Sequence, residues 1–161
     1  MTIAATFKSY LDRENIHYDT VRHKHSSTSM ETAARANVPL TQLAKAVVFR
    51  DENRRYLMAV LPTLCRAEIS RLNTLTNHSL SLAGERELGR LFADCEIGAV
   101  PPMGQAYAMP TIWDDRLCEM EDIYLEAGDH EHLVHMKRSE FSRLLDHCGH
   151  GRFCQPLVSA H

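Results

Sequence analysis

The sequence predicts a domain of the α/β class, in the α+β sense, with helices packed around a mixed β-sheet. Apolar residues recur at helical spacing in some segments, and short apolar or alternating runs typical of strands lie between them. The chain has 161 residues, 44% of them hydrophobic and 24% charged, which is ordinary for one globular domain. We therefore expect a single domain over residues 1–161 with one site.

Two helices are expected near the start of the chain. Apolar side chains at helical spacing predict an amphipathic helix over residues 3–14. Thr28 and Glu31 have the spacing of a capping box, which predicts that a second helix begins there. That helix should end near Asn37, because Pro39 follows.

A β-hairpin with two buried strands is expected next. The apolar runs 44–49 and 56–61 flank a charged turn and indicate the paired strands. The remaining pattern predicts helices around 69–75 and 88–92, strands at 80–82, 106–112, 123–127 and 133–136, and a last helix capped by Ser139. Residues 149–161 are expected to form a loosely ordered tail.

Composition and charge narrow the class of protein. No apolar run is long enough to cross a bilayer and the polar start lacks a signal-peptide core, so we expect a cytoplasmic protein with no membrane partner. The five cysteines are an odd, scattered set, which argues against a disulfide framework. A net charge of −3 gives no overall attraction to nucleic acid, so no DNA partner is expected and any RNA must be held locally.

Lys45 is the first candidate for chemistry, because it opens an otherwise apolar strand. A long cation there either snorkels to the edge of the sheet or serves a buried anion. The first interpretation makes it a structural lysine. The second makes it a point charge for a phosphate or a carboxyl group.

The segment 97–104 is the second candidate. Its two prolines and two glycines exclude a regular helix or central strand and predict a shaped loop. Such a loop could be an ordinary surface turn. It could also aim backbone N–H groups at a carbonyl oxygen, as an oxyanion hole requires.

Two groups of histidines and cysteines contain residue types that can act as metal ligands or general bases. His130, His132 and His135 have no standard metal-ligand spacing and fit an exposed polar turn, although His130 is kept as a candidate. Cys148, His150 and Cys154 lack the second ligand pair of a zinc module. No motif of a serine hydrolase, metalloprotease or nucleotide-binding loop occurs, and no metal or cofactor is expected.

Several segments, in this order and spacing, resemble the YbaK and prolyl-tRNA synthetase-associated family of aminoacyl-tRNA editing domains. The resemblance extends over roughly residues 2–145. It rests on Leu43-Ala-Lys-Ala-Val-Val-Phe49, Leu61-Pro62, Leu80-Ser-Leu-Ala-Gly-Glu85, Gly98-Ala-Val-Pro-Pro-Met-Gly104 and Glu126-Ala-Gly-Asp-His130.

The resemblance implies a mixed, curved, partly barrel-like sheet surrounded by helices, with a pocket for the aminoacylated 3′ end of tRNA. It implies that Lys45 contacts the terminal nucleotide, that the loop from Gly98 to Pro102 positions the scissile ester, and that His130 lies in the pocket. Loop amides around Gly98 and Ala99 would stabilise the oxyanion. The expected catalytic set is Lys45, Gly98, Ala99, Pro102 and His130, and the expected substrate-binding set is Lys45, Val100, Pro101, His130 and Thr28.

The implied function is a free-standing deacylase that hydrolyses mischarged tRNA in trans. The amino acid would be small, such as alanine, cysteine or serine, on proline tRNA, with prolyl-tRNA synthetase as a candidate partner. Alanine-specific members usually carry a polar residue where this chain has Ala46, and the loop reads Val-Pro-Pro, so the amino acid stays open.

Two alternatives remain at this point. A module of the same fold could bind tRNA or a synthetase without hydrolysis. A small thiol or metal enzyme could use Cys148, His150 and Cys154.

Overall fold

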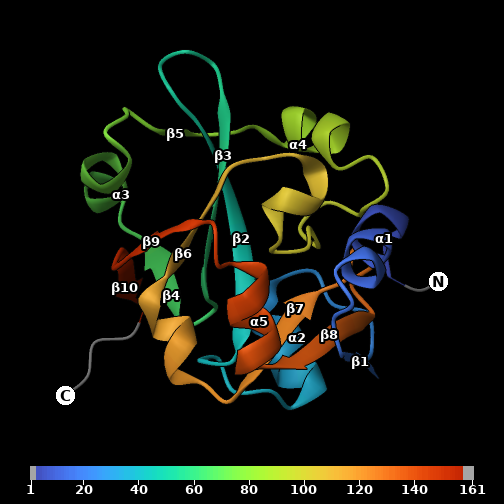
Figure 1. The fold of residues 1–161 in the computed structure, drawn as a ribbon. Helices are drawn as coiled ribbons and strands as arrows, with labels where there is room; N and C mark the ends of the chain where they lie inside the picture. Colours follow the sequence, from blue (N-terminus) through green and yellow to red (C-terminus); the bar gives the residue numbers. More distant parts are fainter. Residues whose placement is uncertain (1–2, 158–161) are drawn as a thin grey trace.

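The computed structural model describes residues 3–157 and contains a mixed eight-stranded sheet with helices around it (Figure 1). The strand order is β1-β8-β7-β2-β3-β6-β9, and β5 pairs additionally with β2. Within the described residues the sheet stays open and does not close into a barrel. The predicted fold class is confirmed. No helix in this part of the chain has the length and apolar character to cross a membrane.

The helices and strands have the following bounds. The helices are α1 (Ala5–Arg13), α2 (Ser29–Ala36), α3 (Ile69–Thr76), α4 (Glu85–Leu91) and α5 (Arg138–Leu144), with 3-10 helices η1 (Gly104–Tyr107) and η2 (Asp115–Glu119). The strands are β1 (Asp19–Arg22), β2 (Leu43–Arg50), β3 (Tyr56–Pro62), β4 (Cys65–Ala67), β5 (Ser81–Leu82), β6 (Thr111–Asp114), β7 (Asp122–Glu126), β8 (His132–Lys137), β9 (Gly149–Gly151) and β10 (Cys154–Pro156).

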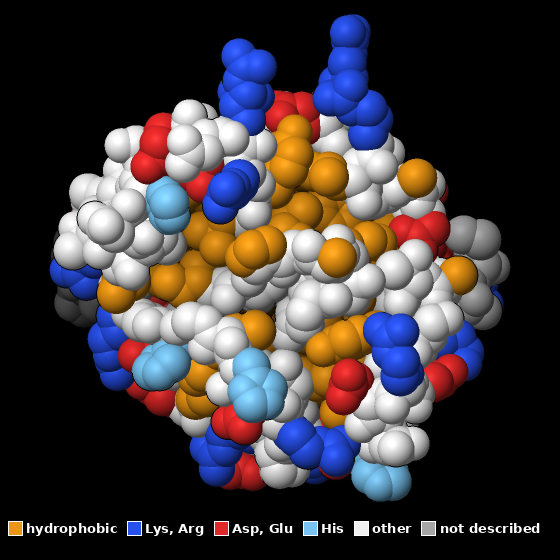
Figure 2. All heavy atoms as spheres, turned by 45° about the horizontal axis from the view of Figure 1, so that its top comes forward, with side chains coloured by type: hydrophobic (Ala, Val, Ile, Leu, Met, Phe, Trp, Pro, Cys, Tyr) orange, Lys and Arg blue, Asp and Glu red, His pale blue; other side chains and the backbone are white. Residues whose placement is uncertain are grey.

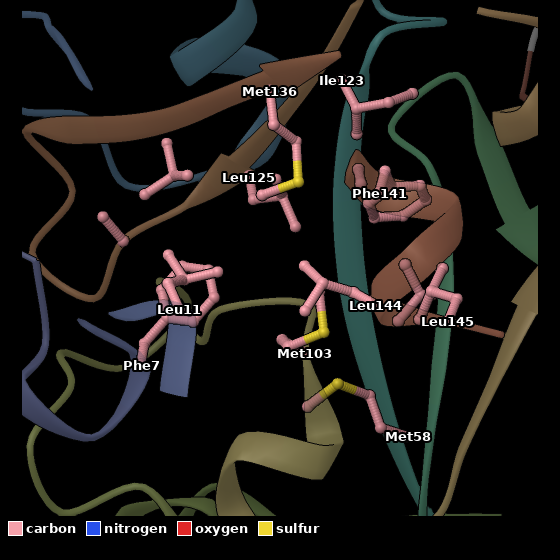
Figure 3. Packing of buried hydrophobic residues seen from close by; sticks show 14 of the residues in the cluster. Phe7, Leu11, Met58, Met103, Ile123, Leu125, Met136, Phe141, Leu144 and Leu145 are labelled. Carbon is pink, nitrogen blue, oxygen red and sulfur yellow. The ribbon is translucent and has the colours of Figure 1, made fainter. Parts of the chain in front are cut away.

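The antiparallel hairpin of β2 and β3 lies at the centre of the sheet, and both of its faces are buried. Met58 and Val60 of β3 point into a core formed with α1 and α5, while Ala59 and Leu61 point into a second core with α3. This alternation is the period of two that a strand imposes on its side chains. Figure 3 shows the first core, where Phe7 and Leu11 of α1 and Phe141 of α5 surround methionine side chains from the sheet and the loop after α4.

Helix α2 begins and ends where the sequence predicts. The Thr28 hydroxyl accepts the Glu31 N–H at 3.2 Å, and Asn37 takes a left-handed conformation with φ 56° that ends the helix. Ala33 and Val38 pack on Leu43 of β2, in a third cluster on the same sheet face as the α3 core. This packing holds α2 against the end of β2 that precedes Lys45.

Three local predictions were wrong. The strand expected at 106–112 is shorter and later, because Gly104–Tyr107 forms a 3-10 helix and β6 begins at Thr111. The N-cap of α5 is Lys137 and not Ser139, and the Lys137 side chain makes no capping hydrogen bond. In the predicted loose tail, β9 pairs with β6 and β10 pairs with β4, which orders residues up to Pro156, while 158–161 lie outside the described residues.

The expectation of no disulfide framework does not hold for one pair of cysteines. Cys65 and Cys154 form a disulfide with their Cα atoms 5.2 Å apart. They are separated by 89 residues in the sequence, and the antiparallel pairing of β4 with β10 brings them together. Cys95, Cys118 and Cys148 are free thiols.

Candidate functional site

A gap in the hydrogen bonding of β2 marks the candidate site. Strand β2 pairs with β7 only at Leu43 and Ala44, and with β5 only at Phe49 and Arg50. Residues 45–48 therefore have no neighbouring strand on that edge. The Gln42 and Val48 carbonyls accept hydrogen bonds from that side, while the Leu43 carbonyl points to the β3 side. Because strand groups alternate, the N–H and C=O of Ala46 point into the gap.

A pocket with a volume of about 190 Å³ lies at this gap. It lies between β2, the segment from β5 to α4, the start of α2, the end of β7 and the loop after α4. Figure 2 turns the end of the molecule that carries β5 and α4 toward the viewer. Hydrophobic side chains gather in the middle of that face, and Lys and Arg side chains stand out at its upper rim. The lining residues are Ser29, Lys45, Ala46, Val47, Val48, Leu82, Ala83, Leu88, Gly98, Val100 and Glu126.

Lys45 lines the pocket as a half-buried cation without a counter-ion. Its ammonium group has no hydrogen-bond or ion-pair partner among residues 3–157, and burial alone lowers its pKa. A snorkelling strand-end lysine would reach water freely. The position of Lys45 inside the pocket instead favours the second interpretation, in which it serves an anion.

Glu126 lines the same pocket and carries a buried carboxyl group. The residue is 2% exposed, and neither carboxylate oxygen has a hydrogen-bond partner in the described structure. Burial raises the pKa of Glu126 to about 7, and Asp129 adds to the rise while the Thr32 hydroxyl opposes it. Glu126 begins one of the segments that carry the family resemblance, but the sequence alone predicts no role for it. The signal was present in the sequence, because Glu126 places a charge directly after the run Ile123-Tyr-Leu125, as Lys45 places one before an apolar run.

The loop after α4 brings Gly98 to the pocket in a conformation that suits glycine. Gly98 has φ +84°, and a Cβ atom there would lie 3.3 Å from Cε1 of His130. The Ala99 N–H donates to the Glu96 carbonyl at 3.1 Å and so closes a turn. The N–H groups of Gly98 and Val100 donate to no acceptor within residues 3–157. Of the two amides expected to face an oxyanion, only that of Gly98 is free.

His130 contacts the backbone of this loop and is not among the residues that line the pocket. Its Nε2 lies 2.6 Å from the Ile97 carbonyl, so Nε2 carries the proton and donates. Nδ1 is buried without a partner in the described structure, and the His25 ring packs edge-on at 5.5 Å. The backbone of His130 is left-handed with φ 61°, in the tight turn between β7 and β8.

The other predicted site residues lie around the loop or outside the pocket. Val100 lines the pocket, whereas Pro101 and Pro102 are buried and are not among its lining residues. Thr28 is exposed and caps α2, and its neighbour Ser29 is the residue that lines the pocket. The predicted set is therefore brought together in part.

His132, His135 and the described part of the tail, residues 149–157, do not assemble into a site. His132 pairs with Asp129 at 2.6 Å, and His135 lies between two aspartates at the opposite end of β8. His150 pairs with Asp115, and Cys154 is in the disulfide. The thiol or metal site predicted as an alternative is thus not formed by Cys148, His150 and Cys154.

Solved structures resemble this fold over nearly the whole chain. A candidate trans-editing enzyme for prolyl-tRNA synthetase superposes with a TM-score of 0.81 at 21% identity, over 94% of this chain and 96% of the other. A hypothetical protein superposes with a TM-score of 0.83 at 18% identity, over 93% and 99%. A candidate signal transduction protein from Marinobacter aquaeolei gives 0.75 at 20% identity, over 92% of this chain and 30% of the other. At such identities the likeness shows the fold.

The sequence itself matches a family model. No curated protein matches the chain. Residues 23–144 match the aminoacyl-tRNA editing domain, and this range includes Lys45, Gly98, Glu126 and His130. The match covers well over half of the chain, which therefore belongs to the aminoacyl-tRNA editing domain family.

Proposed function

We propose that this protein is a free-standing deacylase that hydrolyses the ester of mischarged tRNA in trans. The substrate is proline tRNA that wrongly carries a small amino acid, such as alanine, cysteine or serine. Family membership supports the reaction class, and the pocket at the gap in β2 supports the chemistry. The reaction uses no metal or cofactor in this proposal.

The observation that carries the proposal is the unpaired Lys45 ammonium beside the open edge of β2. A half-buried cation without a counter-ion is expected to bind an anion when one is offered. The terminal nucleotide of tRNA offers its phosphate there, with ribose hydroxyls next to it. The Ala46 backbone groups in the gap and the exposed side chain of Leu82 in the pocket lining offer further contacts to the nucleoside.

Hydrolysis needs little more than positioning in this account. An aminoacyl ester is activated by its own ammonium group and the neighbouring ribose hydroxyl, so no protein nucleophile is required. The amides of Gly98 and Val100 are the proposed donors to the developing oxyanion, in place of Ala99. One such donor contributes about 2.7–4 kcal/mol to lowering the barrier.

His130 is a positioning residue in this scheme. Its hydrogen bond to the Ile97 carbonyl fixes the residue before Gly98, and its ring occupies the space that any larger residue at Gly98 would need. Pro101 and Pro102 stiffen the other side of the loop. Their shared effect is to hold the Gly98 and Val100 amides in one direction before substrate arrives.

Selectivity is proposed to come from exclusion. The walls facing the ester are Val47, Val48, Ala83 and Val100, which leave a small apolar space. Each extra methylene gains only about 1–3 kcal/mol in such a site, so rejection of the larger correct amino acid must be steric. We propose that the protein acts in the cytoplasm on mischarged tRNA released by prolyl-tRNA synthetase. That synthetase is also a candidate partner.

The proposal is tested by deacylation of a panel of mischarged tRNAs that includes alanine, serine and cysteine on proline tRNA. Wild type is expected to hydrolyse at least one of them, and Lys45→Ala to lose most of that activity. Lys8→Ala is the matched control, since Lys8 pairs with Asp12 at 2.7 Å on the surface of α1. It should behave as wild type.

The alternative is a non-catalytic module that holds tRNA or a synthetase. It predicts no turnover on any ester of the panel while tRNA binding persists and weakens in Lys45→Ala. The free Gly98 and Val100 amides favour the deacylase, because binding alone does not require unpaired donors beside the anion site.

A further inference from the structure

The Glu126 carboxyl group is an unpartnered charge at the end of β7. It is buried, both oxygens lack hydrogen-bond partners in the described structure, and the residue lines the pocket. The Thr32 hydroxyl lies close enough to lower the pKa of Glu126, but its hydrogen bond in the structure is with the Ser26 hydroxyl, at 2.5 Å. Burying a carboxyl without hydrogen bonds is costly. A partner from a ligand would remove that cost.

The geometry around Glu126 indicates that this partner is a cation. The parallel pairing ends at Leu43–Tyr124 and Ala44–Leu125, and the next residues of the two strands are Lys45 and Glu126, which both line the pocket. The two side chains nevertheless form no ion pair, and neither group perturbs the pKa of the other. The pocket thus offers one positive and one negative group to a ligand that carries both charges. An aminoacylated nucleotide, the substrate class of the proposed function, has a phosphate and an ammonium group at its two ends.

A metal ion fits this carboxyl less well than an ammonium group. Among residues 3–157, the side chains close enough to share a cation are Asp51, Glu52 and His78 at the hairpin tip, and Glu126 is in no such group. A lone carboxylate provides too few ligands for a metal of high coordination number. It can accept charge-assisted hydrogen bonds from an ammonium group.

We propose that Glu126 accepts hydrogen bonds from the α-ammonium group of the aminoacyl ester. The assignment rests on the proposed deacylase function and deepens it. It makes the protein selective for tRNA with a free α-amino group. Peptidyl-tRNA and other N-acylated esters lack that charge and place an amide against a buried carboxylate, so they are rejected.

The test compares alanyl-tRNA with N-acetylalanyl-tRNA as substrates of wild type and Glu126→Gln. Wild type is expected to prefer the free amine, and the variant to lose about 10-fold to 100-fold in kcat/KM on that substrate alone. Glu119→Gln is the matched control, since Glu119 is a half-exposed surface residue that pairs with Arg152. An unchanged preference in Glu126→Gln overturns the proposal. An equal loss on both substrates also overturns it, because Glu126 would then act on the ester or the water.

A binding measurement separates this inference from the deacylase function. Two stable adenosine analogues are titrated into wild type, one with an alanyl amide on the ribose and one with a lactyl amide, which has a hydroxyl in place of the amine. Tighter binding of the amine that disappears in Glu126→Gln supports the assignment, even if no tRNA is hydrolysed. Equal binding of both analogues by wild type contradicts it. Thermal unfolding of Glu126→Gln checks that the variant is folded.

Discussion

Lys45 and Glu126 directly follow the last paired residues of β2 and β7 and line the same pocket, yet they do not neutralise each other. Each is desolvated in the pocket, and a carboxyl and an ammonium in such a place ordinarily pair. Their separation is therefore a cost to the folded protein. Neutralising either residue is therefore expected to raise the free energy of unfolding and to lower the activity.

Replacing Lys45 by Met should leave the protein at least as stable as wild type. The ammonium is desolvated without a partner, and a methionine of similar length removes that cost. Deacylation should fall by about 100-fold if the lysine supplies a charge-assisted bond to the terminal nucleotide. Urea unfolding and kcat/KM on the active ester measure both effects. A large loss of stability would instead make Lys45 a structural residue.

Stability should depend on pH through Glu126. Its pKa is about 7 in the folded protein against an ordinary 4.5. Below pH 4.5 the Glu126 carboxyl is protonated in both the folded and the unfolded protein, so its raised pKa does not change the free energy of unfolding. As pH rises toward about 7 the unfolded chain ionises first, so the folded state loses roughly 3 kcal/mol relative to it.

Glu126→Gln should remove this part of the pH dependence. Urea unfolding at about pH 5 and pH 8 gives the change for each protein. Wild type should lose more stability than the variant over that interval. The same loss in both proteins would show that Glu126 is ionised or solvated in the folded state.

Gly98→Ala should lower both stability and activity. The left-handed φ of +84° disfavours alanine by about 1–2 kcal/mol, and the added Cβ would press on the His130 ring. Gly89→Ala is the matched control, because a Cβ there meets no atom within 4 Å in the exposed face of α4. It should raise the free energy of unfolding by about 0.5–1 kcal/mol. If Gly98→Ala retained full deacylation, the loop amides would not be the oxyanion donors.

His130→Asn should weaken the loop while keeping the backbone of the turn. Asparagine tolerates the left-handed conformation at this position, but it does not reach the Ile97 carbonyl. The Ala99 amide, which donates to the Glu96 carbonyl and closes the turn, should then exchange hydrogen faster, and kcat should fall by about tenfold or less. Amide exchange by NMR and single-turnover deacylation measure this. Unchanged exchange at the Ala99 amide would rule out a positioning role for His130.

The Cys65–Cys154 disulfide should stabilise the protein without entering the chemistry. Closing a loop across 89 residues contributes at most about 4–5 kcal/mol by the chain-entropy estimate. Cys154→Ala should therefore lower the Tm and leave deacylation at room temperature unchanged, with Cys118→Ala as a control on a free cysteine. A variant with full stability would show that the disulfide adds nothing to folding.

The elements that the sequence predicted well are those with local causes. Thr28 and Asn37 bound α2 by their own hydrogen bonding and backbone preference, and the hairpin of β2 and β3 follows from two apolar runs around a charged turn. The short strands β1, β4, β9 and β10 escaped prediction because they exist through pairing with distant segments. The disulfide was missed for the same reason.

The candidate site was predictable in part. Lys45 and Gly98 were singled out by a charge in an apolar strand and by the composition of a loop, and both line the pocket. The surroundings of these two residues could not be predicted, because they depend on the fold. The gap in β2 arises because β5 and β7 leave its middle free, the Ala99 amide is used in a turn, and His130 faces the back of the loop. Glu126 became a candidate only when its lack of partners was known.

The most direct test of the account is a crystal structure with the stable alanyl-amide analogue of adenosine monophosphate bound. The ligand should lie in the gap between β5 and β7, with its phosphate at Lys45, its carbonyl oxygen at the Gly98 and Val100 amides, and its ammonium at Glu126. A ligand bound elsewhere, such as in the groove lined by Met30 and Ala34 of α2 and by Leu40, would contradict the account.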